Sequence, residues 1–390
     1  MLNSELLRAR LVESGMDAKW SRMFVKKLVD DEAAFEVDQE AKEWALAHGF
    51  FPGRVELYGL TDAVCQEYLP DYSYFMIHPI NHHFRIWVND KLTLKYVLNS
   101  NGCESSMPEY YLYVENDGHY TYLMDSPSNI KKTSNYLIDL LAEKQLLAIK
   151  PNSGTSGGRG FVKLELKDGC FFMNNREVTE CEVRKYLSSI PNHIVTEYAK
   201  QHEELARIWP DSECTLRVIM IKVPSEEYSK ERDWKCIVSY ARFGSSVSGG
   251  ASNLSSGGIG IGFNFETGDY NPTGIRYRKF CDGGSVICSE HPDTKVVWQG
   301  GRLPHWERVR ETILKICRHI SSLDYLGFDI IITEDGMKLC EINTHPAVDY
   351  EQVMCGPVLK KEGSKSFFRD KGLFDINAEQ FLSIYQSCCE

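Results

Sequence analysis

Two acidic side chains and an amide near the end of the sequence could together bind a metal ion. Residues 326–346, LGFDIIITEDGMKLCEINTHP, contain two apolar strand-like stretches joined by Glu334–Gly336. A three-residue loop that ends in glycine is a common hairpin connection, and it would place Asp329 opposite Glu341. Asn343 lies two residues further on and shares the face of Glu341. Because facing carboxylates repel each other, we expect a cation such as Mg²⁺, which prefers carboxylate and amide oxygens, between them.

The register of this hairpin leaves alternatives open. A two-residue turn at Asp335-Gly336 would place Asp329 opposite Ile342, and the two carboxylates would then lie on opposite faces. The acids could also be solvated surface groups beside a lysine. The apolar run Ile330–Ile332 favours a buried strand, in which a carboxylate needs a partner.

A glycine-rich segment between two other strand-like stretches could cover phosphate groups. Residues 146–166, LLAIKPNSGTSGGRGFVKLEL, have alternating apolar positions on both sides of a tip that runs from Pro151 to Gly160. Most hairpin loops have only about two to five residues, and the four glycines of this tip make it costly to order. Bare backbone N–H groups can approach phosphate oxygens. Lys150, at the end of the first strand, could reach the same phosphates.

This segment matches no single nucleotide-binding motif by itself. Arg159 rather than glycine lies five residues after Gly154, so the GxxxxGK[ST] pattern is absent, and so is the strand–GxGxxG–helix context. A mobile hairpin without a ligand is therefore the alternative interpretation.

Three further segments carry residues that suit a nucleotide. Asn89 or Asp90 can cap a helix whose first turn contains Lys91, a cation that is unfavourable there unless it faces an anion. A solvated lysine is the alternative. The extended connector around Glu197 can present backbone groups to an adenine, with a later acid for the ribose. Arg217, inside the apolar stretch TLRVIMIKV, faces either solvent or a cleft.

In their order along the chain these segments resemble the ATP-grasp superfamily of ATP-dependent carboxylate–amine ligases. The stretches IKPNSGTSGGRGF, QH…TLRV and GFDIIITEDGMKLCEINTHP are most similar to the sugar-transfer-associated ATP-grasp branch, over roughly residues 85–350. The resemblance implies an α+β fold in which two lobes hold ATP between two antiparallel sheets, after a mainly helical N-terminal region. The boundaries expected are 1–85 for the helical and aromatic N-terminal region, 86–200 for the first lobe with its glycine-rich lid, 201–355 for the second lobe with the metal site, and 356–390 for a C-terminal tail.

The resemblance also implies a role for each matching residue. Lys150 and Arg217 would be catalytic, with Arg217 stabilising an acyl phosphate. Asn253 is a further candidate, although Ser252 precedes it where this branch would have an acid. Asp329, Glu341 and Asn343 would hold one or two Mg²⁺ ions, which Mn²⁺ could replace. The nucleotide would contact Lys91, Lys150, Ser153, Gly154, Ser156, Gly157, Gly158, Glu197, Tyr198, Ala199 and, at the ribose, Glu204.

The function implied is an ATP- and Mg²⁺-dependent ligase that forms an amide through an acyl phosphate. A sugar acid or an amino acid would be its carboxylate substrate, in polysaccharide or related biosynthesis, and Arg242, Arg276 and Arg278 are candidates for binding that carboxylate. A small-molecule kinase on the same fold is one alternative, and a non-catalytic nucleotide-binding regulatory protein is another. The N-terminal region does not resemble the α/β domain that usually precedes an ATP-grasp fold, so substrate recognition cannot be carried over.

Composition limits the remaining classes. A net charge of −11 and a pI near 5.6 argue against a non-specific nucleic-acid binder. No run approaches the ~20 apolar residues of a membrane span, and the first residues lack the apolar core of a signal peptide. The 13 cysteines form no CxxC pair, which predicts reduced thiols in a cytoplasmic protein. The partners expected are small-molecule carboxylate and amine substrates, and the oligomeric state stays open.

The elements that must position the site can be outlined as well. Residues 1–50 carry leucines at helical spacing. The aromatic segment 68–87 predicts a buried strand with a proline turn, although His82 and His83 could instead line an acceptor pocket. Further helices are expected near 179–189 and 305–322.

Overall fold

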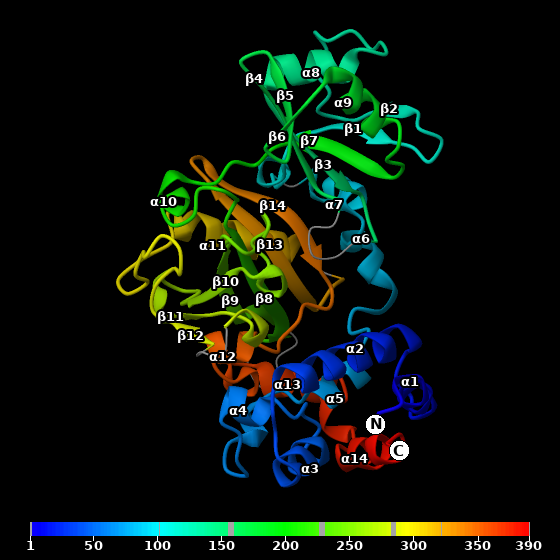
Figure 1. Ribbon diagram of the computed structural model, residues 1–390, viewed down its shortest axis with the longest axis vertical. Helices are drawn as coiled ribbons and strands as arrows, with labels where there is room; N and C mark the ends of the chain where they lie inside the picture. The colour runs from blue at the N-terminus through cyan, green and yellow to red at the C-terminus, as the bar shows by residue number, and fades with distance from the viewer. Residues whose placement is uncertain are drawn as a thin grey trace.

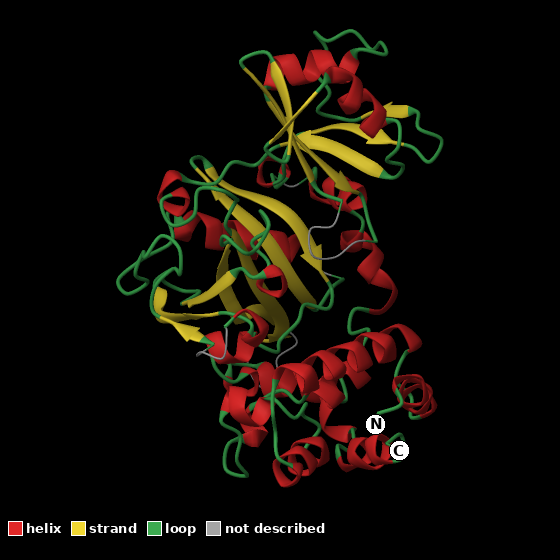
Figure 2. Ribbon diagram, viewed as in Figure 1, coloured by secondary structure: helices red, strands yellow, loops and turns green. Residues whose placement is uncertain are grey.

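Two antiparallel sheets and a helical region lie one after another along the long axis of the computed structural model (Figure 1; Figure 2). The structure describes residues 2–100, 102–154, 160–225, 231–281, 286–320 and 322–389. The predicted α+β fold with two sheet lobes and a helical N-terminal region is confirmed. None of the described helices is long and apolar enough to cross a membrane. All 13 cysteines are free.

The first lobe is a seven-stranded sheet in the order β2-β1-β7-β3-β4-β5-β6, with two helices on one face. Its elements are β1 (Tyr110–Val114), β2 (Tyr120–Tyr122), α8 (Tyr136–Lys144), β3 (Leu146–Pro151), β4 (Val162–Lys167), β5 (Cys170–Met173), β6 (Arg176–Val178), α9 (Glu180–Leu187) and β7 (His193–Glu197). Ile149 pairs with Val162 and Leu147 with Leu164, which confirms the predicted hairpin. Leu147 and Ile149 lie in the core beneath α8 and α9, so the alternation of β3 places Lys150 on the opposite face.

The second lobe is a seven-stranded sheet in the order β12-β11-β10-β9-β8-β13-β14. Its elements are α10 (Glu203–Ala206), β8 (Thr215–Pro224), β9 (Arg232–Phe243), β10 (Ile259–Phe263), β11 (Tyr270–Ile275), β12 (Ile287–Cys288), α11 (Trp306–His319), β13 (Tyr325–Thr333) and β14 (Gly336–Asn343). The helices predicted near 179–189 and 305–322 are α9 and α11. The apolar stripe of α11 packs against one face of this sheet through Val309, Ile313 and Ile316.

The other face of the second sheet is divided between two uses. Along β8, Leu216, Val218 and Met220 point into the core that α11 covers. The alternating residues Ile219 and Ile221 are buried against the helical region instead. Arg217 lies on that second face as well, beyond the area that the helical region covers, because side chains alternate along a strand. The helical region therefore adjoins the part of the sheet that carries the charged residues.

The hairpin of β13 and β14 differs from the predicted register at its turn. Thr333 pairs with Gly336, so the turn has two residues and the predicted three-residue loop is wrong. A β-bulge follows between Ile330, which pairs with Leu339, and Asp329, which pairs with Glu341. Cys340 is the extra residue. The turn is one residue shorter than predicted, and the bulge adds one residue to β14, so the two shifts in register cancel. The predicted opposition of Asp329 and Glu341 is therefore confirmed although the predicted turn is not.

The helical region is built from both ends of the chain. From the N-terminal side come α1 (Ser4–Glu13), α2 (Ala18–Ala34), α3 (Gln39–Ala47), α4 (Arg54–Tyr58) and α5 (Asp71–Met76), and from the C-terminal side come α12 (Glu351–Cys355), α13 (Ser364–Asp370) and α14 (Glu379–Gln386). Leu7, Phe24, Phe367 and Phe381 share one buried core. The two ends lie side by side, and the Asn3 N–H donates to the Cys388 carbonyl at 2.8 Å (Figure 1).

The segment that joins the helical region to the first lobe is helical rather than extended. The buried strand predicted for residues 68–87 is wrong: its aromatic residues form α5, in which Tyr72, Tyr74 and Phe75 are all buried between other helices and the second sheet. The 3₁₀ turn η2 (His82–Arg85) and the helices α6 (Ile86–Asn89) and α7 (Lys91–Leu98) follow. Further 3₁₀ turns are η1 (Cys65–Glu67), η3 (Glu104–Ser106), η4 (Leu254–Ser256), η5 (Arg278–Phe280), η6 (Val358–Lys360) and η7 (Leu373–Asp375).

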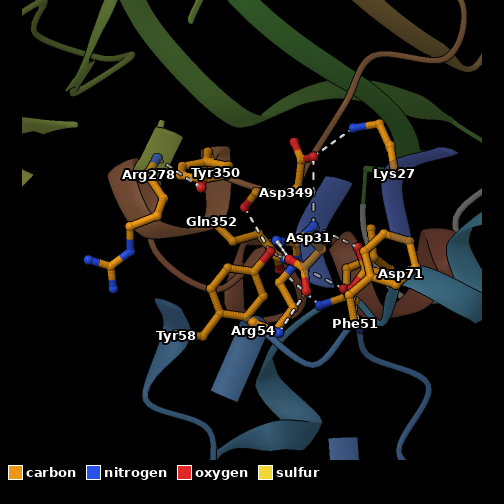
Figure 3. A network of polar contacts seen from close by, with 12 residues as sticks. Lys27, Asp31, Phe51, Arg54, Tyr58, Asp71, Arg278, Asp349, Tyr350 and Gln352 are labelled. Carbon is orange, nitrogen blue, oxygen red and sulfur yellow. Dashed lines mark hydrogen bonds and ion pairs between the residues drawn. The ribbon is translucent and has the colours of Figure 1, made fainter. Parts of the chain in front are cut away.

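Arg54, the first residue of α4, is buried among three aspartates from different segments (Figure 3). Its guanidinium lies 2.9 Å from an Asp31 oxygen, 3.3 Å from an Asp71 oxygen and 3.8 Å from an Asp349 oxygen. Asp349, which follows β14, also pairs with the Lys27 ammonium at 2.6 Å. Only 3% of the Arg54 side chain is exposed. This network fastens α2, α4 and α5 to the segment that follows the last hairpin.

Replacing Arg54 with methionine should strongly destabilise the protein. Methionine has a similar length, but the three aspartates would remain buried without their shared cation, and breaking a buried pair typically costs about 3–5 kcal/mol. Urea unfolding followed by circular dichroism measures the change. The control is Arg8→Met, which removes an exposed pair on α1 and should change stability by less than ~0.5 kcal/mol. Equal free energies of unfolding for Arg54→Met and wild type would contradict the role of the network.

Candidate nucleotide and metal site

Lys150 lies where β3 of the first lobe meets β14 of the second lobe. The groups that act on its charge include Cys340 and Glu341 from β14 and Lys91 and Lys95 from α7. The pKa of Lys150 is lowered from 10.5 to about 8, mainly by burial and also by the two lysines, while Cys340 and Glu341 oppose the change. Its ammonium lies 5.7 Å from the centre of the Tyr110 ring, and no hydrogen bond or ion pair joins it to another described residue. Lys150 is therefore a cation available to an anionic ligand.

Lys91 is held at the start of α7 by contacts with both lobes. Asp90 caps the helix through an oxygen that accepts from the Thr93 N–H at 2.8 Å, which confirms the predicted helix start. Asn152, at the end of β3, accepts from the Lys91 N–H through its carbonyl at 3.1 Å. The Lys91 ammonium lies 3.3 Å from a Glu341 carboxylate oxygen. The carboxylate offsets the unfavourable position of a cation in the first helical turn.

Asp329 is buried and paired with two arginines. Arg217, directly opposite on β8, donates from Nε at 2.5 Å and from Nη2 at 3.0 Å, and an Arg242 nitrogen lies 3.1 Å away. Burial alone would raise the pKa of Asp329, but the two guanidinium groups hold it below its usual value of 3.8. Arg242 also donates to the Asn253 side-chain oxygen at 3.2 Å. The structure thus brings Asn253 into the same polar group as Asp329.

The residues predicted to bind metal lie together. Asp329 pairs in register with Glu341, and the Asn343 amide donates to a Glu341 oxygen at 3.2 Å. Carboxylate and amide oxygens suit Mg²⁺. Among the described residues, no three His, Cys, Asp or Glu side chains form a group that could hold a metal. Two carboxylates and one amide are too few for the octahedral shell of Mg²⁺, so they fit an ion whose remaining ligands are phosphate oxygens and water.

Comparison with known proteins identifies the family. A model described as sugar-transfer associated ATP-grasp matches residues 76–366. The chain belongs to this family. The resemblance predicted from the sequence is thereby confirmed, over a longer region than the motifs alone covered. A search of curated proteins found no match.

A search of solved structures found similar chains at low sequence identity. One is the ATP-grasp ligase PsnB with a precursor variant, Mg and ADP: identity is 13%, the TM-score is 0.36, and 74% of this chain and 60% of that chain are covered. Another is the N5-carboxyaminoimidazole ribonucleotide synthetase purK with ADP: identity is 12%, the TM-score is 0.35, and 67% of this chain and 45% of that chain are covered. A third is D-alanyl-alanine synthetase A from Vibrio cholerae O1 biovar eltor str. N16961: identity is 13%, the TM-score is 0.38, and 76% of this chain and 66% of that chain are covered. The chain matches less than two thirds of the length of each, and the family assignment rests on the family model alone.

The connector between the two ATP-grasp lobes lines a cavity of about 420 Å³. Glu197 and Tyr198 contribute to its wall, together with Lys338 from β14. The Glu197 carboxylate lies 3.1 Å from the Lys338 ammonium and accepts from the Glu109 N–H at 3.0 Å. Ala199 is buried. The predicted adenine-contacting residues therefore lie together at the hinge, and two of them border this cavity.

Sequence reasoning chose Glu204 for the ribose, but the structure places another acid beside the connector. The Glu204 side chain is exposed on α10 and forms no hydrogen bond or ion pair with a described residue. Glu213, just before β8, accepts from the Gln201 N–H at 2.6 Å. Burial raises the pKa of Glu213, and a hydrogen bond from Tyr198 opposes that change. The only feature of the sequence that could have pointed to Glu213 is its position just before the strand that carries Arg217.

The structure describes the glycine-rich lid up to Gly154 and again from Gly160. Ser153 is half-buried, and Gly154 has φ +80°, a left-handed conformation that glycine adopts without strain. Ser156, Gly157 and Gly158, which were also predicted to contact phosphates, lie outside the described residues.

The predicted substrate-binding cations are not gathered in one place. Arg242 belongs to the site through Asp329. Arg278 instead pairs with Glu56, and its guanidinium lies 5.2 Å from the centre of the Phe35 ring in the helical region. Arg276, on the segment after β11, is half-buried, and it lies near the charges of His291 and Asp293 rather than near Asp329. His82 and His83 are exposed in η2.

Glu213→Gln should weaken nucleotide binding. Loss of one hydrogen bond to a charged group costs about 1–2 kcal/mol, which is a fall in affinity of roughly five- to thirtyfold. Calorimetric titration of ADP with Mg²⁺ measures it. Glu204→Gln is the matched control and should bind as wild type does. If Glu204→Gln lost affinity and Glu213→Gln did not, the ribose contact would belong to Glu204, as the sequence predicted.

ATP affinity should fall as the pH rises through the pKa of Lys150. A lysine whose pKa is lowered to about 8 is charged below that pH and loses its charge above it. If its ammonium contacts phosphate, the dissociation constant of ATP should increase above about pH 8 in wild type. Lys150→Arg should bind ATP with less dependence on pH, because a guanidinium stays charged. Titrations between about pH 7 and about pH 9.5 measure both proteins, and equal slopes would remove Lys150 from contact with the nucleotide.

Proposed function

We propose that the protein is an ATP- and Mg²⁺-dependent ligase that activates a carboxylate as an acyl phosphate and transfers the acyl group to an amine. The observation that carries the proposal is the meeting of Lys91 and Lys150 with the acidic end of β14, where the Lys91 ammonium and Glu341 are 3.3 Å apart. Cations from one side can hold a triphosphate while oxygen ligands from the other side hold the metal. Membership of the ATP-grasp family over residues 76–366 supports the same activity.

The charged groups have distinct roles in this proposal. Lys150 and Lys91 contact the ATP phosphates. Asp329, Glu341 and Asn343 would hold Mg²⁺, which would neutralise phosphate charge during the transfer.

The arginines act through Asp329 as well as through their charge. Arg217 binds both oxygens of Asp329, which fixes the orientation of a metal ligand, and its positive charge offsets charge that develops on the transferred phosphoryl group. Arg242 bridges Asp329 and Asn253. Asn253 can therefore orient Arg242 or contact the reacting groups directly.

The reaction needs no covalent enzyme intermediate. A substrate carboxylate oxygen attacks the γ-phosphorus atom of ATP, the bond to the bridging oxygen breaks, and ADP leaves. The amine nitrogen then attacks the acyl carbon, inorganic phosphate leaves, and the nitrogen loses a proton to solvent. Cys340 is the thiol beside Lys150, and burial raises its pKa to about 11 although Lys150 opposes the change. A protonated thiol is a poor nucleophile, so Cys340 is not needed for the chemistry.

The nucleoside end of ATP is assigned to the connector. The backbone of Glu197, Tyr198 and Ala199 meets adenine in this proposal, and Glu213 accepts from a ribose hydroxyl. Ser153 and Gly154 belong to the lid over the phosphates.

A sugar acid or an amino acid is the proposed carboxylate substrate, and surface-polysaccharide assembly is the proposed setting. The description of the family as sugar-transfer associated supports this choice. A cytoplasmic reaction fits the requirement for ATP and the free state of all 13 cysteines.

Hydroxylamine distinguishes the ligase from its alternatives. Purified protein is given ATP, Mg²⁺ and one carboxylate at a time, and ADP and hydroxamate are measured together. A ligase gives equal amounts of both, because hydroxylamine traps the acyl phosphate. ADP release with a hydroxyl substrate and no hydroxamate would indicate a kinase. Nucleotide binding without ADP release in any mixture would indicate a regulatory protein.

Lys150→Met should abolish this reaction while the fold survives. Removing one preorganised cation from a phosphoryl-transfer site should lower carboxylate-dependent ADP release by about 100-fold or more. Lys167→Met is the control, since Lys167 is exposed at the far end of β4. Thermal unfolding of both variants should match wild type. Turnover in Lys150→Met at the wild-type rate would remove Lys150 from the phosphate role.

A further inference from the structure

Trp20, in the first turn of α2, is packed between two histidines where the helical region meets the second lobe. Its ring centre lies 4.8 Å from that of His78 and 4.4 Å from that of His345. His345 follows Asn343 by two residues, so this junction adjoins the proposed metal site. The Lys19 ammonium lies over the same indole ring, 5.0 Å from its centre.

A second cation, Arg85, is the last residue of the turn η2, directly before α6. Residues 82–87 are all exposed, so this guanidinium is open to solvent. Its Nη1 donates to the His82 carbonyl at 2.8 Å. One turn further on, the Asn89 side-chain oxygen accepts from the Thr344 hydroxyl at 3.1 Å. That bond ties α6, and with it the turn that carries Arg85, to the segment after β14.

These cations have no counter-ion in the described part of the chain. Neither Lys19 nor Arg85 forms an ion pair with a described residue, in contrast to Lys27 and Arg54 nearby. Unpaired positive charge next to a buried aromatic cluster is the arrangement that attracts an anion.

His78 adds a polar group that the protein itself leaves unused. One ring nitrogen bonds the Tyr74 carbonyl at 2.6 Å, and the buried Nε2 has no hydrogen-bond partner among the described residues. Only 6% of His78 is exposed. A buried polar atom without a partner is unfavourable unless a ligand or water reaches it.

We propose that Lys19 and Arg85 bind the carboxylate substrate at the junction of Trp20 and His345. This inference rests on the proposed ligase function and deepens it, because it names the helical region as the substrate-binding wall of the active site. The ATP phosphates already have Lys91 and Lys150. An amine substrate is cationic before it reacts and would be repelled here. The carboxylate is the anionic substrate that remains, and in a protein of net charge −11 it needs local cations.

The test measures substrate affinity separately from ATP affinity. Lys19→Gln, Arg85→Gln and the double variant are compared with wild type and with Lys26→Gln. Lys26 is exposed on the same helix and forms no ion pair with a described residue, so it controls for loss of charge alone. D-glucuronate, D-galacturonate and the common amino acids are offered one at a time with hydroxylamine. ADP release gives KM for the carboxylate and for ATP, and calorimetry measures binding of the same carboxylate to the ADP–Mg²⁺ complex.

Each single variant should raise the carboxylate KM by about tenfold or more, since each removes a charge-assisted hydrogen bond. KM for ATP should change by less than about twofold, and Arg85→Lys should restore part of the affinity. An unchanged carboxylate KM in the double variant, or an equal rise in Lys26→Gln, would overturn this inference and leave the ligase proposal intact. If no carboxylate bound to the complex or stimulated ADP release, the ligase proposal itself would fail.

Discussion

Burying a guanidinium requires negative charge around it, and that requirement organises the helical half of the molecule. Arg54 pairs with aspartates from α2, α5 and the segment after β14, three parts of the chain that are distant from one another in sequence. Asp349 follows the end of β14 by only a few residues, so the same cluster determines the path of the chain after the β13–β14 hairpin. The position of His345 against Trp20 follows from this attachment.

Charge is balanced inside the proposed nucleotide and metal site by the protein's own groups. Asp329 is held by Arg217, and Glu341 by Lys91. A divalent ion bound to the same oxygens would weaken both pairs, and the cations set free would then need new anions. A triphosphate supplies them. Metal and nucleotide should therefore enter as a unit, which agrees with a donor set too small to hold Mg²⁺ alone.

Short-range sequence patterns correctly predicted the structural features that depend on neighbouring residues. The cap at Asp90, the alternating hairpin around Lys150 and the stripe of α11 all follow from short-range spacing. The segment 68–87 did not, because its aromatic residues are buried on several sides by helices that are distant in sequence, and uniform burial hides the helical period. The position of Glu213 beside the connector could not be predicted from the sequence either, because its contact with Tyr198 forms only when the connector folds back. No local sequence pattern predicts that the helices at the two ends of the chain pack together.

The bulge at Cys340 decides which face of the last hairpin carries Glu341. Each single-residue step along a ladder exchanges the two faces of a strand. If Cys340 were paired regularly, it would lie opposite Asp329, and Glu341 would point to the apolar side among the residues beneath α11. Because the bulged residue has no partner on β13, its removal would leave Glu341 directly after Leu339 and still opposite Asp329. The facing carboxylates therefore tolerate a change or loss of the thiol, whereas a shift that closed the bulge with Cys340 still in the chain would separate them.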